Sequence, residues 1–243
     1  MKEQSTIFIS DIHLGITDSL HIANFIKFLQ HMKKKNISIY ILGDLFNFWA
    51  GNSQARVGVI RTLLKELKSY SKNAPLYFLG GNRDFLFSHY WEKKNGQVID
   101  DGSIINAGKK QIMLFHGDCM CTHDIQYQKV RRILQSKIVH FLSCFLPTSF
   151  ALAIGRKLRN ISKETVSKKK SNILKMDIDY MKKLLKEKSC KIMICGHAHI
   201  QKTIAFDFGT NSYKIFILPE SSINIFNYLV LENERFSFQS FKV

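Results

Sequence analysis

The chain lacks the features that mark secreted, membrane-spanning and disordered proteins. Its five cysteines are an odd number without a Cys-x-x-Cys pair, which argues against a disulfide framework or a structural zinc site. No run reaches the about 18 uncharged apolar residues of a spanning helix, and the first residues contain no apolar signal-peptide core. Three prolines and 45% hydrophobic residues among 243 argue against disorder. We expect one folded domain over residues 1–243, in a reducing cytosol.

Acidic residues are also scarce, and the resulting positive charge is concentrated in one segment. The chain has 36 Lys+Arg against 19 Asp+Glu, a net charge of +17. Residues 129–170 hold 11 of the basic side chains and one acid, Glu164, which is a net of +10. This segment therefore favours an anionic partner, such as nucleic acid, a phosphorylated substrate or an anionic bilayer.

Apolar runs typical of buried strands alternate with helical patterns along the chain. This order predicts an α/β fold with a largely parallel core sheet. Alternating residues near the C-terminus predict antiparallel strands that complete the fold. We expect helices at 20–35, 57–70 and 176–188, and strands at 6–10, 38–42, 76–79, 111–115, 191–195, 213–218, 226–231 and 236–240.

Ligand-type polar residues follow the first five of these strands directly, four times beside a glycine. In open α/β sheets, ligands bind outside the carboxyl ends of the strands, so the patches are expected to meet at one place. Glycine there allows sharp turns and close approach to a ligand. The patches are Asp11-Ile12-His13, Gly43-Asp44, Gly81-Asn82-Arg83-Asp84-Phe85, His116-Gly117-Asp118 and Gly196-His197-Ala198-His199.

The side chains in these patches suit a transition metal. Asp11 and His13 are two residues apart, so in extended backbone both would point to one side and reach one ion. His197 and His199 repeat that spacing, and Asp44 offers a carboxylate able to bridge two cations. Nitrogen and oxygen ligands without thiolate favour manganese, iron or zinc over calcium. The expected metal ligands are Asp11, His13, Asp44, Asn82, His116, His197 and His199.

One such patch alone is more often a cap, a turn or an ordinary histidine, but five in order at strand ends predict a two-metal phosphoester-cleaving site. From Asp11 to His199, the series resembles the calcineurin-like metallophosphoesterases. The resemblance implies an α/β sandwich of two β-sheets flanked by helices, with two manganese ions as cofactors. It assigns Asp11, His13, Asp44 and His199 to one ion, and Asp44, Asn82, His116 and His197 to the other, with Asp44 as the bridge.

Arg83 narrows the expected chemistry. Many relatives have a histidine here, which is a candidate proton donor to an alkoxide leaving group. Arginine stays protonated and cannot donate usefully, but it stabilises charge on phosphate oxygens. We therefore expect a leaving group that needs no proton, such as one phosphate of a pyrophosphate. The structural alternative is that Arg83 only pairs with Asp84.

Within the family, residues 43–49, 81–86, 116–128 and 162–164 resemble the UDP-2,3-diacylglucosamine diphosphatases of lipid A biosynthesis. This resemblance implies hydrolysis of UDP-2,3-diacylglucosamine to UMP and 2,3-diacylglucosamine 1-phosphate (lipid X). A metal-activated water would attack the α-phosphorus. By the same resemblance, Arg83, Asn82 and His197 are catalytic. The expected substrate contacts are Asn82, Arg83, Asp124, Tyr127, Ser162, Lys169 and His197. The chain departs from the pattern around Pro219-Glu220-Ser221, where relatives often have a tryptophan.

A helical insertion is expected at about residues 129–175. Its apolar residues recur at helical spacing among arginines and lysines, from Val130 to Phe145 and from Phe150 to Ile161. Such helices suit an anionic bilayer surface, and the alternative is a helical pair that packs its apolar stripe on the core. If the insertion binds a bilayer, the resemblance implies a peripheral protein at the cytoplasmic face of the bacterial inner membrane. The insertion would then be a lid over the acyl chains.

Two other functions fit parts of the sequence. A nuclease or nucleotide phosphodiesterase on the same fold would use the net charge of +17. However, the charge lies on an apolar helical segment with few aromatic residues for base stacking, so no nucleic-acid partner is expected. A non-catalytic binding module on this fold should have lost metal ligands, and none is missing here.

Overall fold

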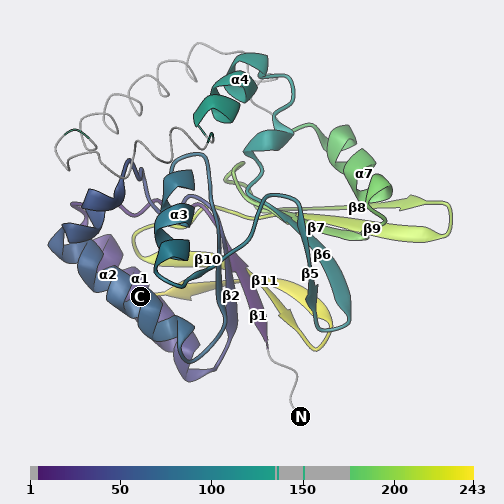
Figure 1. The fold of residues 1–243 in the computed structure, drawn as a ribbon. Helices are drawn as coiled ribbons and strands as arrows, with labels where there is room; N and C mark the ends of the chain where they lie inside the picture. Colours follow the sequence, from purple (N-terminus) through teal and green to yellow (C-terminus); the bar gives the residue numbers. More distant parts are fainter. Residues whose placement is uncertain (1–4, 135, 137–149, 151–175) are drawn as a thin grey trace.

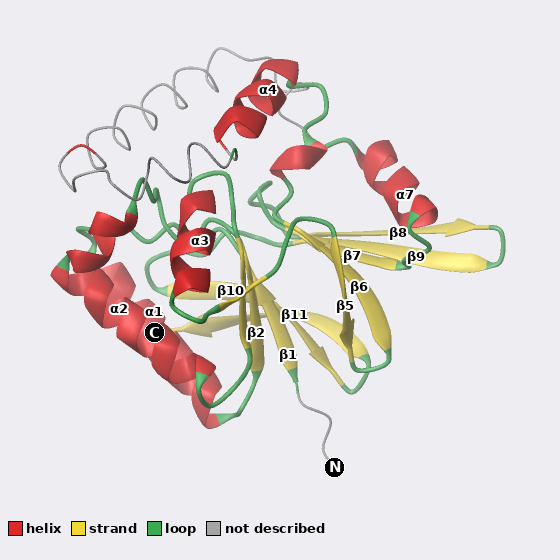
Figure 2. Cartoon of the chain, viewed as in Figure 1, coloured by secondary structure: helices red, strands yellow, loops and turns green. Residues whose placement is uncertain are grey.

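Two mixed β-sheets pack face to face in the computed structural model, which describes residues 5–134, 136, 150 and 176–243. Helices lie against the outer face of each sheet, as Figures 1 and 2 show. The strand order is β11-β10-β1-β2-β3-β4 in one sheet and β5-β6-β7-β9-β8 in the other. The sandwich of two sheets flanked by helices that the resemblance implied is therefore confirmed.

The six-stranded sheet has a parallel half and an antiparallel half. β1 to β4 run parallel, whereas β10 is antiparallel to both β1 and β11. Its strands are β1 (Thr6–Ile9), β2 (Ser38–Leu42), β3 (Leu76–Leu79), β4 (Gln97–Val98), β10 (Ile225–Glu232) and β11 (Arg235–Lys242).

In the five-stranded sheet, β6, β7 and β9 are parallel, and β5 and β8 are antiparallel edge strands. The strand expected at 213–218 as antiparallel is β9, which is antiparallel to β8 but parallel to β7. The prediction is therefore confirmed for the pairing with β8 and wrong for the pairing with β7, because alternation shows which face of a strand is buried and not the direction in which the strand runs. The strands are β5 (Ser103–Ala107), β6 (Lys110–Phe115), β7 (Ile192–Cys195), β8 (Lys202–Phe208) and β9 (Asn211–Ile217).

The central strands are buried on both faces, because each separates two apolar layers. In β1, Ile7 and Ile9 face the helices, whereas Phe8 faces the other sheet. In β6, Ile112 and Leu114 lie in the layer between the sheets. Strands covered on both faces appear in sequence as continuous apolar runs, which is why their positions could be predicted.

Helices α1 to α3 cover the six-stranded sheet, and α7 covers the five-stranded sheet (Figure 1). Asp18 begins α1 by accepting the N–H of His21 at 3.0 Å, and Asp177 does the same for Tyr180 in α7 at 2.9 Å. The helices are α1 (Ser19–Lys34), α2 (Gly58–Ser71), α3 (Phe85–Lys93), α4 (Ile125–Leu134) and α7 (Ile178–Glu187), with 3₁₀ turns η1 (Asn52–Arg56) and η2 (Asp118–Met120).

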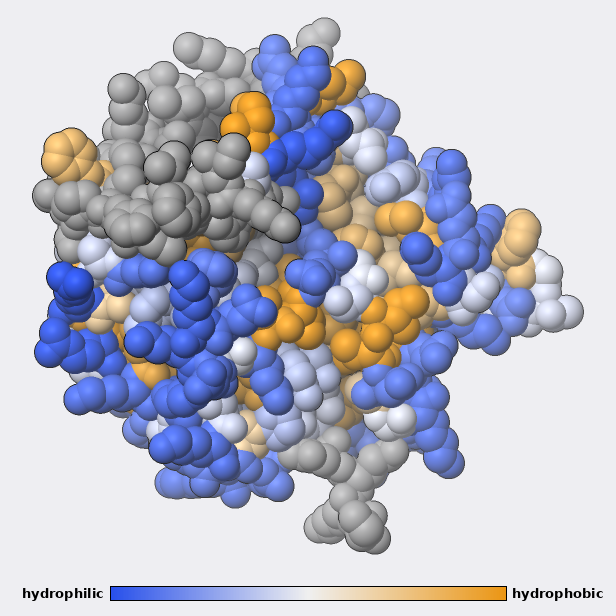
Figure 3. Space-filling model, in the orientation of Figure 1, coloured by the Kyte–Doolittle hydropathy of each residue, from blue (hydrophilic) through white to orange (hydrophobic). Residues whose placement is uncertain are grey.

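The end of helix α4, from residue 129 to 134, is the part of the expected insertion that the structure describes at length. None of the ten residues of α4 is buried, and Ile125, Val130 and Ile133 are 65%, 51% and 65% exposed. Figure 3 shows apolar residues beside polar ones over this helix. The rest of the insertion, except for positions 136 and 150, lies outside the described residues. Among the described helices, none is long and apolar enough to cross a membrane.

Candidate metal centre

The five ligand patches meet at the carboxyl ends of β1, β2, β3, β6 and β7. The loop after β1 lies on the loop after β2, because Asp11 N–H donates to Gly43 O at 3.1 Å. The loops after β6 and β7 are joined by Gly196 N–H, which donates to His116 O at 2.7 Å. The two sheets are joined by His197 N–H, which donates to Asp11 Oδ2 at 2.8 Å. Patches far apart in sequence thus form one site.

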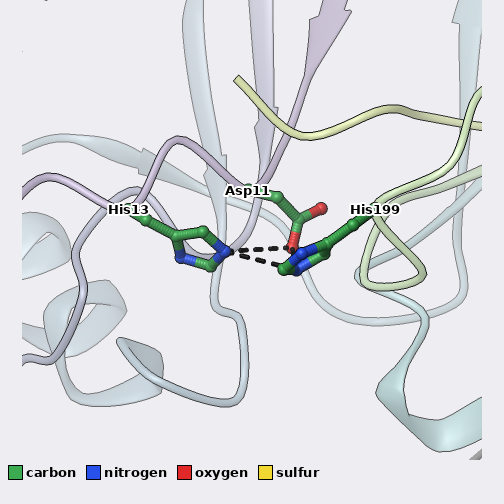
Figure 4. Close-up of side chains that lie close together, drawn as sticks. All are labelled: Asp11, His13 and His199. Carbon is green, nitrogen blue, oxygen red and sulfur yellow. Dashed lines mark hydrogen bonds and ion pairs between the residues drawn. The ribbon is translucent and has the colours of Figure 1, made fainter. Parts of the chain in front are cut away.

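Asp11, His13 and His199 form the first compact group of candidate ligands (Figure 4). The Asp11 Oδ1 atom lies 3.2 Å from His199 Nε2 and 3.9 Å from His13 Nε2. The two histidine Nε2 atoms are 3.3 Å apart. His13 Nδ1 is buried and has no hydrogen-bond partner among the described residues. Nitrogen and carboxylate atoms directed at one point are the donor set of a divalent transition metal.

A second compact group contains Asp11, Asp44 and His116. His116 Nδ1 lies 2.9 Å from Leu42 O, and a carbonyl only accepts, so Nδ1 carries the proton of the neutral ring. The Nε2 lone pair then faces Asn82 Oδ1 at 2.9 Å and Asp44 Oδ1 at 3.7 Å. His116 Nε2, Asn82 Oδ1 and Asp44 Oδ1 are all acceptors, so a cation fits between them. A metal-binding histidine needs this tautomer, with its other nitrogen donating to a carbonyl or carboxylate.

Asp44 lies between the two groups. Its Oδ2 is 3.9 Å from His13 Nδ1, and its Oδ1 is 3.7 Å from His116 Nε2. The ring of His197 stands edge-on to that of His116, with centroids 5.2 Å apart. The structure therefore brings all seven expected ligands together, and Asp44 lies where a bridging carboxylate would be needed. Asp11 also belongs to both groups.

The backbone at the candidate ligands is left-handed, not extended. Among the described residues, ten other than glycine have positive φ, and five of them are candidate ligands. The expectation that extended backbone directs i and i+2 to one side was therefore wrong, although Asp11 and His13 do lie in one group. Left-handed backbone is uncommon in residues other than glycine, although Asp and His adopt it more often than most, and it concentrates at functional sites. The φ values are 52° at Asp11, 57° at His13, 52° at Asp44, 67° at His197 and 57° at His199.

Burial removes the ionisable side chains of the site from water, and this shifts their pKa values. Burial raises the pKa of Asp44 to about 7, with His116 opposing this shift and Asp84 adding to it. Burial, followed by the nearby Arg83 charge, lowers the pKa of His13 to about 3. A cation would favour ionised carboxylates and neutral imidazoles at once, so the electrostatics also fit a metal.

Asp84 holds the loops of the site in place. Its buried carboxylate accepts the N–H groups of Asp44 at 3.1 Å, Phe46 at 3.1 Å and Gly81 at 2.9 Å. Arg83 does not pair with it: the Arg83 Nε atom lies 3.3 Å from Asp44 Oδ2, and the Arg83 N–H donates to Asp44 Oδ1 at 3.0 Å. The alternative in which Arg83 only pairs with Asp84 is therefore wrong. The Arg83 side chain remains 35% exposed at the mouth of the site.

Asp124 and Tyr127, two expected substrate contacts, lie in a polar network beside the metal centre. The Asp124 carboxylate accepts the N–H of Tyr127 at 3.0 Å in the first turn of α4. The Tyr127 hydroxyl donates to Asp118 at 2.6 Å. Both therefore have structural partners, and their contact with substrate stays a prediction. Ser162 and Lys169 lie outside the described residues.

Arg131 connects the same network to the metal centre. Its Nε donates to Asp118 Oδ2 at 2.7 Å, and its Nη2 bonds Asp101. The other oxygen of Asp101 accepts the N–H of His116 at 2.8 Å. The sequence patterns placed Arg131 only among the basic residues of the insertion and did not predict its link to Asp101, because these two residues are distant along the chain. None of the residues of α4 is buried, so these polar contacts, and not apolar packing, attach the helix to the His116 loop.

We expect Arg131→Ala to destabilise the protein by about 2 kcal/mol, because it leaves the buried Asp118 carboxylate without its charged partner. Urea unfolding measures this loss. Arg132→Ala is the matched control, since Arg132 is the exposed neighbour on the same helix, and it should stay within about 0.5 kcal/mol of the wild type. Equal midpoints for the two variants would contradict a stabilising role for the network.

Comparison with known proteins agrees with this geometry. The family model for calcineurin-like phosphoesterases matches residues 5–201. A Histophilus somni (strain 129Pt) protein named UDP-2,3-diacylglucosamine hydrolase is 32% identical over 200 residues, which cover 82% of this chain and 85% of the relative. A protein of the same name from Aeromonas hydrophila is 35% identical over 198 residues, with coverages of 80% and 81%.

A solved structure of an archaeal phosphodiesterase aligns over 99% of this chain and 100% of its own length, with a TM-score of 0.51. Its sequence identity is 14%, so it supports the fold alone. The family model covers most of the chain, and the curated relatives exceed 30% identity over four-fifths of it. The chain therefore belongs to the calcineurin-like phosphoesterase family.

Proposed function

We propose that the chain hydrolyses the pyrophosphate bond of UDP-2,3-diacylglucosamine, releasing UMP and 2,3-diacylglucosamine 1-phosphate in lipid A biosynthesis, with two manganese ions as cofactors. The observation that carries the proposal is a pair of adjacent ligand groups that share Asp11: Asp11, His13 and His199 in one, and Asp11, Asp44 and His116 in the other. The relatives named UDP-2,3-diacylglucosamine hydrolase support the choice of substrate.

Seven side chains would hold the metal ions: Asp11, His13, Asp44, Asn82, His116, His197 and His199. When bound, the ions supply an activated water and neutralise the phosphoryl oxygens of an in-line displacement. The bond from the α-phosphorus to the bridging oxygen breaks, and the lipid 1-phosphate leaves with the electron pair. Arg83 faces the site beside Asp44 and stabilises charge on the phosphate oxygens without transferring a proton. The proposed catalytic residues are Arg83, Asn82 and His197. The proposed substrate contacts are these three residues together with Asp124, Tyr127, Ser162 and Lys169.

The proposed substrate carries two acyl chains, which need an apolar surface near the metal centre. The exposed apolar residues of α4 support such a surface, because Ile125, Val130 and Ile133 face away from the core while Arg131 anchors the helix beside His116. We infer that the 129–175 insertion of this single domain covers the acyl chains, and that the protein acts peripherally at the cytoplasmic face of the inner membrane. Clustered basic residues would assist binding to anionic lipid.

The test is manganese-dependent UMP release from UDP-2,3-diacylglucosamine, with UDP-glucose and a nitrophenyl phosphodiester as comparison substrates. We expect UMP from the diacyl substrate alone, and loss of this activity in chelator with recovery on adding manganese. An Asp44→Ala protein purified in parallel measures any contaminating hydrolase.

Equal turnover of all three substrates would reduce the function to that of a generic phosphodiesterase. Cleavage of DNA, with binding that weakens steeply as salt rises, would favour a nuclease instead.

A further inference from the structure

Glu220 lies outside the seven expected ligands, yet its side chain reaches one of them. Its Oε2 lies 2.9 Å from His199 Nδ1, on the opposite edge of the ring from Asp11. The other ring nitrogen, His199 Nε2, faces Asp11 Oδ1 at 3.2 Å. The imidazole of His199 therefore bridges Glu220 on one side and the candidate metal group on the other.

This arrangement determines which nitrogen of His199 can bind a metal. An ionised carboxylate only accepts hydrogen bonds, so Glu220 requires the proton on Nδ1. A neutral imidazole has one N–H, so with a cation between Nε2 and Asp11 Oδ1, Nε2 presents its lone pair to that cation. His116 follows the same rule at the other group, where the acceptor is Leu42 O at 2.9 Å from Nδ1. Metal-binding histidines generally need such a partner to fix the tautomer and the ring orientation.

The backbone around Glu220 is held by both sheets, so its side chain does not depend on a loose loop. Asn227, in β10 of the six-stranded sheet, donates its side-chain N–H to Glu220 O at 2.8 Å. The next residue, Ser221, is buried and donates its N–H to Asp11 O at 3.1 Å. Leu218 donates its N–H to Cys195 O at 2.7 Å, at the end of β7. The segment that carries Glu220 is thus tied to the loops that carry Asp11 and His199.

We propose that Glu220 is a positioning residue that fixes the Nδ1–H tautomer of His199 and so strengthens metal binding at the Asp11–His13–His199 group. The inference rests on the proposed metal centre but is independent of the proposed substrate.

Calorimetric titration of the full-length, metal-stripped protein with manganese tests this role without using activity. We expect Glu220→Ala to weaken binding at one site by about 10-fold or more, the range for loss of a partner behind a metal ligand. Glu220→Gln should stay close to the wild type, because its amide oxygen still accepts the Nδ1–H. Glu187→Ala, which removes an exposed carboxylate on α7 that pairs with Lys183 at 3.7 Å, should bind as the wild type does.

Two results would overturn the proposal. If Glu220→Ala binds manganese like the wild type, the contact with His199 is only a surface ion pair. If Glu220→Gln is as weak as Glu220→Ala, the carboxylate acts by charge or direct ligation and does not act by holding the tautomer. A wild-type protein that binds no manganese would overturn the proposed metal centre itself, so the two failures can be told apart.

Discussion

Arg83→Ala is expected to lower kcat on the proposed substrate by about 100- to 1,000-fold, the usual effect of removing one charge-stabilising donor from an active site. The guanidinium lies at the mouth with its Nε 3.3 Å from Asp44 Oδ2, so it can reach phosphate oxygens held at the metal centre. Manganese affinity should not fall, because the removed charge repels cations. Steady-state kinetics and manganese titration on the same preparation measure the two effects separately.

Arg83→Lys is the informative companion variant. It keeps the positive charge but replaces the planar fork with a single ammonium, so we expect a rate between those of the wild type and Arg83→Ala. Full activity of Arg83→Ala would remove Arg83 from catalysis and leave it a structural partner of Asp44. Loss of metal binding in that variant would assign the rate defect to the metal centre instead.

The central strands could be predicted from sequence, because each is an apolar run that ends in a turn. The bounds of β2 and β3 match the expectation, since both strands are covered by other layers. The patterns missed β5 and β8, which lie at the edges of their sheet, and β4, which has two residues. Edge strands mix exposed polar residues with apolar ones, so they lack the continuous runs of covered strands. Helix α3 was missed as well, because it begins directly after the Asn82-Arg83 loop.

The candidate ligands could be predicted because each belongs to a short patch at a strand end. Their partners could not be, because tertiary structure alone brings them near. Glu220 reaches His199 only after the β8–β9 hairpin has returned the chain to the site. Arg131 reaches Asp101 from a different element. The left-handed backbone at Asp11 and His13 was also unforeseen, since positive φ is uncommon in residues other than glycine.

Gly81→Ala is expected to damage both stability and activity, because a side chain has no room at this position. An added Cβ would lie 2.2 Å from Asp44 Oδ1 and 2.4 Å from Asp44 N, and backbone cannot yield as a flexible side chain does. Gly43 packs closely against Gly81, since a Cβ added at Gly43 would lie 2.7 Å from Gly81 Cα. The loops after β2 and β3 must therefore separate, and Asp44 must move with them.

We expect Gly81→Ala to lose about 1–3 kcal/mol of unfolding free energy from overpacking, and on the order of 100-fold in kcat/KM from displacement of Asp44. Gly58→Ala is the matched control: nothing lies within 4 Å of its added Cβ, and it begins α2. That variant should gain about 0.4–1 kcal/mol, because alanine loses less backbone entropy on folding. Urea unfolding, manganese titration and kinetics on both variants separate the steric effect from a general effect of glycine replacement. If Gly81→Ala binds manganese and turns over substrate like the wild type, the loops can separate without moving Asp44. The close contact between Gly81 and Asp44 would then have no role in the site.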